Sequence, residues 1–214
     1  FSIANLSLVP PDFLAAARRG AINFHDGPLP RHAGLNAPVW ALLEGESRHG
    51  ITWHFIEGGI DEGRILLSRS FDIAPDDTAL TLNTRAFQAA LESFGDLVAK
   101  ISADALQPVA QDFSQRSYHA RDDRPAAAAR LDFTRPAAEL ARLVRALDHG
   151  SYTNPLALPK IVAAGQILVV GSAEEVSGRG CRVRQPRYLR WEQKRAAASK
   201  AATPPTVCWP RPAQ

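Results

Sequence analysis

An alternation of short apolar runs with helical patterns over the first hundred residues most constrains how this 214-residue chain can fold. Strand-like runs cover residues 1–6, 21–25, 50–57 and 64–73, and helical patterns cover residues 12–19, 38–46 and about 78–103. The last pattern carries an apolar stripe, and Asp76, Asp77 and Thr78 before it are typical of a helix N-terminus. Strands that alternate with helices predict an α/β fold with a mostly parallel sheet.

The second half of the chain has a different character. Polar residues and a run of alanines dominate residues 108–130, which we interpret as a linker on the surface. Thr134 is suited to cap a helix over residues 136–147, and strand-like runs follow at residues 160–163 and 166–170. We therefore expect four regions: an α/β domain at residues 1–107, a linker at 108–130, a small second domain at 131–178 and a tail at 179–214.

The positive charge of the chain is confined to the predicted tail. Residues 1–178 hold 16 Lys and Arg against 21 Asp and Glu, a net charge of −5. Residues 179–214 hold 9 Lys and Arg and only one acidic residue, a net charge of +8. Nucleic-acid binding by the main body of the chain is therefore not favoured.

Composition and the chain start suggest a cytoplasmic protein and a missing segment. Apolar residues make up 45% of the chain and charged residues 22%, which is ordinary for a globular protein. No apolar run is long enough to cross a membrane, so no membrane partner is expected. The two cysteines, Cys181 and Cys208, form neither a metal motif nor a disulfide framework. Because the chain starts at Phe1 and contains no Met, we expect residues upstream of it.

The densest group of polar residues with catalytic potential combines Asn23, His25 and Asp61. Residues two apart on a strand point to the same face, so Asn23 and His25 should project together at the end of their strand. Ligands of open α/β sheets bind at such strand ends. The loop of residues 26–34 is rich in Pro and Gly, and Asp61 lies in a loop with three glycines. An amide donor, an imidazole and a carboxylate together suit acyl-type transfer.

Four short motifs carry a family resemblance. They are Asn-x-His at residues 23–25, Leu-Pro-x-x-x-Gly at 29–34, Gly-x-Thr at 50–52 and Asp-x-Gly at 61–63. In order and spacing they resemble the formyltransferases that use 10-formyltetrahydrofolate. The resemblance covers roughly residues 1–170 and implies a Rossmann-like catalytic domain followed by the start of a small β-barrel-like domain. The family's first strands and helices have no counterpart before Phe1, so the catalytic domain is expected to be N-terminally truncated.

The resemblance also implies a role for each motif. Asn23 would bind the formyl oxygen, His25 would stabilise the tetrahedral intermediate, and Asp61 would orient or charge His25. Leu29, Pro30 and Gly34 would support the site from their loop, and no metal would be needed. The folate would lie against Leu6, Leu8 and Val9 and against Glu57, Gly58, Gly59 and Ile60.

The sequence leaves the acceptor amine and two alternative functions open. Gly27 and Pro28 replace the family's usual Ser, in a form that resembles formylation domains of peptide synthetases. A carrier-bound aminoacyl group or an amino sugar is therefore favoured over methionyl-tRNA. Hydrolysis of 10-formyltetrahydrofolate would use the same three residues, and a truncated remnant without catalysis is the second alternative. The other histidines show no metal spacing and are interpreted as structural or solvated.

Overall fold

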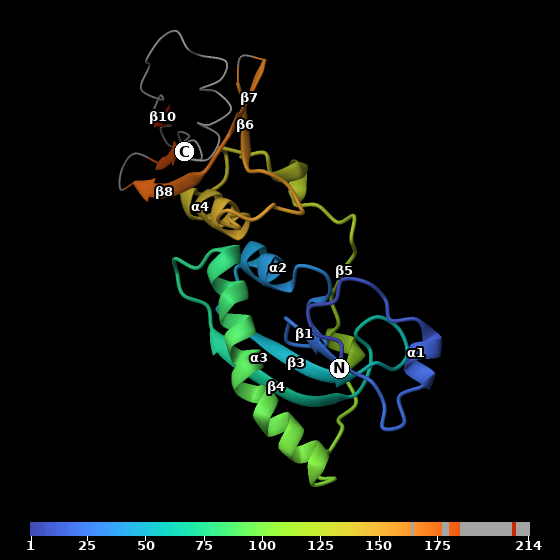
Figure 1. Ribbon diagram of the computed structural model, residues 1–214. Coiled ribbons are helices and arrows are strands. Elements are labelled where there is room, and N and C mark those ends of the chain that lie inside the picture. Colours follow the sequence, from blue (N-terminus) through green and yellow to red (C-terminus); the bar gives the residue numbers. More distant parts are fainter. Residues whose placement is uncertain (164, 177–179, 185–206, 209–214) are drawn as a thin grey trace. The chain divides into compact units, whose positions relative to one another are not determined.

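The computed structural model describes residues 1–163, 165–176, 180–184 and 207–208, which fall into two compact units. The first unit comprises residues 1–75 and 81–122, and the second comprises residues 76–80 and the described residues from 123 onward. Figure 1 shows the elements of both. The domain limits expected at residues 107 and 131 stay predictions.

A three-stranded antiparallel sheet forms the centre of the first unit. Its order is β1–β3–β4, with β1 at Ile22–His25, β3 at Arg48–Phe55 and β4 at Ile65–Asp72. These three strands differ from the mostly parallel arrangement expected from the sequence. Only nine residues separate β3 from β4, and so short a connection can join only antiparallel neighbours.

Parallel pairing occurs in shorter pieces of the first unit. Ser2 forms a parallel bridge with Asn23, and β2 (Ala33–Gly34) pairs in parallel with β5 (Tyr118–His119). The expected strand over residues 1–6 is reduced to the bridge at Ser2. Phe1 and Leu6 are 63% and 73% exposed, so this segment has little of the burial that would stabilise a central strand.

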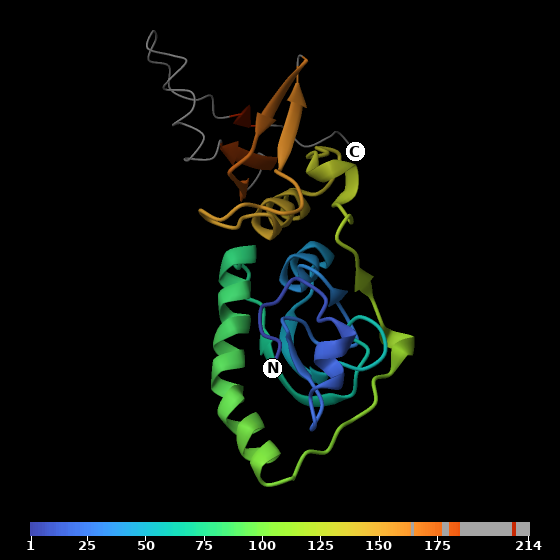
Figure 2. The same ribbon diagram turned by 45° about the vertical axis from the view of Figure 1, so that its right-hand side comes forward.

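Helices complete the first unit. α1 (Pro11–Ala15) is shorter than the helix expected over residues 12–19, whereas α2 (Ala37–Glu44) and α3 (Ala79–Ser102) confirm their predictions to within two residues. In Figure 2, α3 runs along the central strands. Its apolar stripe packs on the sheet, and the indole N–H of Trp53 donates to the Ser93 hydroxyl over 3.0 Å. The shared core consists of Ile22, Phe24, Ile51, Trp53, Leu66, Leu67, Ala86, Ala90 and Leu97.

The expected linker contains structure of its own. Besides β5 it holds two short 3-10 helices, Phe113–Gln115 and Ala126–Ala129. Backbone hydrogen bonds tie its first half to the first unit: the N–H groups of Ala33 and Leu35 donate to the carbonyls of Ser117 and His119 over 3.0 Å each.

The second unit packs α4 (Ala137–Ala146) against small antiparallel sheets. Strands β6 (Lys160–Ala163) and β7 (Gln166–Val169) were expected from the sequence and pair as an antiparallel hairpin, and a second sheet has the order β10–β9–β8. Its strands are β8 (Ser172–Val176), β9 (Gly180–Arg184) and β10 (Val207–Cys208). Among the described residues these sheets do not close into a barrel. The remainder of the predicted tail lies outside the described residues.

Two further expectations concern a helix cap and membrane crossing. Thr134 does not cap α4, because Pro136 occupies the cap position and the Thr134 hydroxyl instead donates to Asp132 over 2.7 Å. Of the helices in the described part of the chain, none has the length and apolar character needed to cross a membrane.

Candidate active site

Strand β1 places two of the predicted catalytic side chains. Its pairing with β3 sets Asn23 opposite His54 and His25 opposite Thr52. Because side chains alternate along a strand, Asn23 and His25 emerge on the same face. Asn23 is half-buried and His25 is buried.

The Pro- and Gly-rich loop after β1 is fixed by the threonine of the Gly-x-Thr motif. The buried Thr52 hydroxyl donates to the Gly27 carbonyl over 2.8 Å and accepts the Leu29 N–H over 3.1 Å. The Leu29–Pro30 peptide bond is cis. Both hydrogen-bonding functions of one hydroxyl are therefore used to hold this loop beside His25.

The ring of His25 is held between a carbonyl and a carboxylate. Its Nε2 lies 2.8 Å from the His32 carbonyl, and its Nδ1 lies 3.4 Å from Asp61 Oδ2. A carbonyl can only accept, so Nε2 carries a proton and donates. A second proton on Nδ1 would give both ring nitrogens an acceptor, which suits a cationic imidazolium beside an ionised Asp61.

Gly27 makes room for this ring. A Cβ atom at position 27 would lie 2.7 Å from His25 Nε2 and 2.9 Å from the Ala37 side chain. Since real Cβ contacts are never that short, a larger residue would displace the imidazole. Gly27 departs from the family pattern, and the space occupied by His25 and Ala37 explains why a glycine is needed at this position.

Asp61 connects the other members of the site. It is one of the residues with a left-handed backbone, at φ 54°, and only 10% of its side chain is exposed. Oδ2 accepts the Gly34 N–H over 2.9 Å, and Oδ1 lies 3.3 Å from His54 Nε2. The structure thus brings Asn23, His25 and Asp61 together, as their spacing in the sequence predicted.

These contacts keep Asp61 ionised. Burial opposes ionisation, but hydrogen bonding by His54, the proximity of His25 and the Gly34 N–H together outweigh it. The pKa of the Asp61 carboxyl is lowered to about 2. At neutral pH this residue is therefore a carboxylate facing the His25 ring.

His54 is a member of the site that sequence reasoning missed. Its Nδ1 donates to the Phe55 carbonyl over 2.7 Å, and its Nε2 lies 3.3 Å from both Asn23 Nδ2 and Asp61 Oδ1. Neutral His54 accepts from the Asn23 amide, whereas doubly protonated His54 donates to Asp61. The available signal was its position on the strand that carries Thr52, two residues before it.

The Asp61 loop is held from outside by residues of the expected linker. Gln111 Nε2 donates to the carbonyls of Asp61 and Gly63 over 2.8 and 2.7 Å. Arg116 donates to the Ile60 carbonyl over 3.0 Å. No sequence signal indicated these contacts, because they join residues about 50 positions apart.

Two further titratable side chains lie beside the site. Burial raises the pKa of the Asp26 carboxyl, and Asp61 adds to this effect while His25 opposes it. Burial lowers the pKa of His49 to about 4, although its contact with the Asp26 carbonyl, at 2.8 Å, acts in the other direction. His49 is therefore neutral at neutral pH.

The residues expected to contact folate are less tightly gathered. Leu6 and Leu8 are 73% and 79% exposed, which excludes core packing as the reason for this apolar segment. Glu57 pairs with Arg64 over 2.8 Å, and Ile60 is 41% exposed. The role of Leu6, Leu8, Val9, Glu57, Gly58, Gly59 and Ile60 in folate binding stays a prediction.

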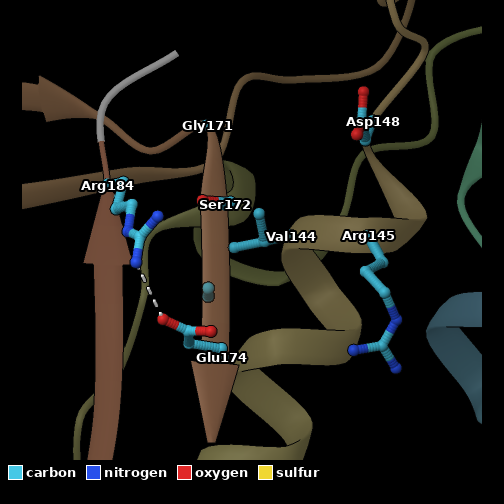
Figure 3. A pocket seen from close by; sticks show the side chains of 8 residues that line it. Val144, Arg145, Asp148, Gly171, Ser172, Glu174 and Arg184 are labelled. Carbon is cyan, nitrogen blue, oxygen red and sulfur yellow. Dashed lines mark hydrogen bonds and ion pairs between the residues drawn. The ribbon is translucent and has the colours of Figure 1, made fainter. Parts of the chain in front are cut away.

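A hollow of about 270 Å³ lies apart from these residues, in the second unit. Figure 3 shows Glu174 and Arg184 side by side at its wall, joined by an ion pair of 3.3 Å. No predicted site residue lines it. The lining residues are Val144, Arg145, Asp148, Gly171, Ser172, Ala173, Glu174 and Arg184.

Comparison with known proteins finds a similarity to formyl transferases over part of the chain. Residues 3–98 match the family model described as formyl transferase. The chain is 32% identical over 116 residues to GDP-perosamine N-formyltransferase of Brucella melitensis, and the match covers 54% of this chain and 44% of that protein. The chain therefore matches less than half the length of this curated relative.

Solved structures agree on the fold. A 4-N formyltransferase from Francisella tularensis superimposes with a TM-score of 0.69 at 19% identity, covering 82% of this chain and 71% of the other. The formyltransferase PseJ from Anoxybacillus kamchatkensis, solved with UDP-4,6-dideoxy-4-formamido-L-AltNAc and tetrahydrofolate, is 28% identical. The match covers 56% of this chain and 62% of the PseJ chain, with a TM-score of 0.50. Residues 3–98, which include Asn23, His25 and Asp61, are thus similar to the formyl transferase family.

Proposed function

We propose that this chain transfers a formyl group from 10-formyltetrahydrofolate to the amine of an amino sugar. The observation that carries the proposal is the position of Asp61. One of its oxygens faces His25, and the other faces the histidine that contacts Asn23. Asn23, His25 and an ionised Asp61 thereby lie together, with His54 beside both Asn23 and Asp61.

The reaction would begin with attack of the acceptor amine on the formyl carbon. A carbon–nitrogen bond forms, and the formyl oxygen gains negative charge as the carbon becomes tetrahedral. An amide nitrogen carries two N–H donors, so Asn23 can contact His54 with one and the formyl oxygen with the other. Such a donor acts where charge develops, which is where it accelerates the reaction most.

His25 and Asp61 would complete the transfer. His25 stabilises the tetrahedral intermediate, while Asp61 accepts a proton from the attacking amine directly or through water. When the intermediate collapses, the bond to the folate N10 breaks, and Asp61 returns the proton to that nitrogen. The two side chains are adjacent, with a contact of 3.4 Å between them.

The choice of donor and acceptor rests on the relatives. PseJ was solved with tetrahydrofolate and a formamido sugar nucleotide, and the Brucella relative is named for a GDP-linked amino sugar. Both favour an amino sugar over the carrier-bound aminoacyl group and methionyl-tRNA considered from the sequence. The folate is proposed to contact Leu6, Leu8, Val9 and residues 57–60.

The test is an assay of formyl transfer by the purified chain. The chain is incubated with 10-formyltetrahydrofolate and one acceptor at a time. The acceptors are a nucleotide-linked 4-amino sugar, an aminoacyl carrier protein and methionyl-tRNA. Mass spectrometry of each acceptor then reports a gain of one formyl group. We expect formylation of the amino sugar, and we expect Asn23→Ala to reduce kcat by roughly 10²–10³-fold because one oxyanion donor is removed.

A matched control separates catalysis from folding. Asn83→Ala removes the same side chain from α3, away from the site, and should leave kcat unchanged. Formate release without any formylated acceptor would replace the proposal with hydrolysis. Equal rates for the parent and Asn23→Ala would show that the Asn23 amide takes no part.

A further inference from the structure

Two histidines and a glutamate converge outside the proposed catalytic group. His32 lies in the loop after β1, Glu44 lies at the end of α2 and His119 lies on β5. His32 Nδ1 is 3.1 Å from His119 Nε2, which is 3.9 Å from Glu44 Oε1. All three potential ligand atoms lie within 4.8 Å of one another.

The two imidazoles are buried and firmly oriented. His32 is fully buried and His119 is 9% exposed. Trp40 stacks on the His119 ring with a centroid distance of 4.5 Å and an interplanar angle of 5°. Ligands whose rotamers are fixed in advance lose little entropy when a metal ion binds.

A second carboxylate, that of Glu46, lies beside the His32 ring. Its Oε2 lies 3.1 Å from His32 Nε2, on the opposite edge of the ring from Nδ1. The pair is close enough for an ion pair, although its geometry is not that of a hydrogen bond. Glu46 therefore adds a second carboxylate beside the two imidazoles.

The charge of the cluster also favours a cation. Glu44 and Glu46 contribute two carboxylates, and Arg31 contacts both of them. With neutral imidazoles, this group carries one excess negative charge. Arg31 binds Glu44 through Oε2 and leaves Oε1 on the side of His119.

We propose that His32, His119 and Glu44 bind a divalent transition metal ion of the Zn²⁺ class. Ligand atoms about 2.0–2.1 Å from a tetrahedral zinc lie roughly 3.3–3.4 Å apart, close to the observed 3.1 and 3.9 Å. Two imidazoles and a carboxylate are a ligand set that zinc accepts, with a fourth position left to water. The sequence concealed this group, because its members are 12 and 75 residues apart.

This site is separate from the proposed reaction, and the inference does not rest on formyl transfer. The His32 carbonyl does accept a hydrogen bond from His25, so His32 is a poor position for a test. Glu44 and His119 are better, since neither contacts Asn23, His25 or Asp61 through a described hydrogen bond. The Glu44 side chain is 40% exposed, so Glu44→Gln should fold normally.

The experiment measures zinc bound to the whole chain by equilibrium dialysis after removal of metals. We expect one Zn²⁺ per parent chain, and affinities at least about tenfold weaker for His119→Ala and Glu44→Gln. His149→Ala, a histidine of the second unit, is the matched control and should bind as the parent does. Zinc should also raise the Tm of the parent more than that of Glu44→Gln.

Two outcomes would overturn the assignment. One is zinc binding by Glu44→Gln and His119→Ala that equals that of the parent. The other is the absence of zinc binding by the parent, which would leave the contact of 3.1 Å between His119 and His32 as a direct N–H···N hydrogen bond. Replacing Zn²⁺ with Co²⁺ tests whether the metal binds the cysteines instead of this site. A thiolate charge-transfer band would show that the metal is bound to sulfur, and it would also contradict the assignment.

Discussion

Asp61 shows how one side chain can be buried and still charged. Its carboxylate contacts the Gly34 N–H, the His25 ring and the His54 ring. These partners replace the water that burial removes, and they hold the pKa at about 2 against an ordinary value of 3.8. The same contacts that keep Asp61 ionised therefore also stabilise the fold.

The pH dependence of stability should reveal this contribution. A carboxyl whose folded pKa lies below its unfolded value stabilises the native state above the unfolded pKa. The stabilisation is lost as the pH falls through 3.8 towards 2. We expect the parent to lose about 2 kcal/mol more than Asp61→Asn between pH 5 and pH 2, measured by urea unfolding. Identical pH profiles for the two proteins would contradict the assigned contacts.

At the scale of elements, the loop between β3 and β4 is the part of the site that the rest of the unit must position. Gly63 packs directly on strand β3, where a Cβ atom would lie 1.8 Å from the Phe55 carbonyl oxygen. Gly95, in the middle of α3, has no atom within 4 Å of its corresponding position. Position 63 therefore has no room for a side chain, whereas position 95 does.

Alanine at these two glycines should have opposite effects. Gly63→Ala forces the loop away from β3, so we expect a lower Tm and a large loss of kcat. Gly95→Ala removes backbone freedom from the unfolded chain and should stabilise the protein by about 0.4–1 kcal/mol. Thermal unfolding of both variants gives the comparison. A Gly63→Ala protein as stable as the parent would show that the loop lies elsewhere.

Gln111 tests whether the segment after α3 positions the Asp61 loop. Its amide donates to two carbonyls of that loop, and each such bond contributes about 0.5–1.5 kcal/mol. Gln111→Ala should therefore expose residues 57–63 to proteolysis and lower kcat, while Gln107→Ala, at an exposed position four residues earlier, should do neither. Formylation rates and limited proteolysis measure the two effects, and equal behaviour of the two variants would argue against a positioning role.

Local patterns predicted most of the elements but not the contacts between distant ones. The apolar stripe of α3 and the alternation in β3 depend on nearest neighbours along the chain, and both predictions are confirmed. The Asn-x-His and Asp-x-Gly motifs likewise predicted that Asn23, His25 and Asp61 lie close together, and their catalytic roles stay a prediction. The antiparallel sheet, the role of His54 and the contacts of Gln111 depend on how segments meet in space, which residue spacing does not record.

At the scale of the whole molecule, stability should respond to pH in two separate steps. Protonation of Asp61 lowers the free energy of unfolding below about pH 4. Protonation of His49 lowers it between pH 6.5, its unfolded pKa, and about pH 4, its folded pKa. His49 is 1% exposed, and the folded state resists its protonation. The unfolded chain therefore binds the proton more readily, and stability is lost as the pH falls through this range.

Replacing His49 should remove the upper step. We expect the unfolding free energy of the first unit to fall by about 3 kcal/mol between pH 7 and pH 4 in the parent. His49→Gln, which keeps a hydrogen-bond donor for the Asp26 carbonyl, should show a much flatter profile over the same range. Denaturant titrations at each pH provide the measurement. A step of equal size in both proteins would assign it to another group.

The segment of residues 32–35 gives the molecule an internal reporter. On one side its backbone pairs with Ser117 and His119, and on the other the Gly34 N–H points at Asp61 Oδ2 over 2.9 Å. An amide proton held by an ionised carboxylate is shielded from exchange with solvent and shifted downfield in an NMR spectrum. The Gly34 resonance would therefore report whether Asp61 is ionised, and it would do so without any label on a bound ligand.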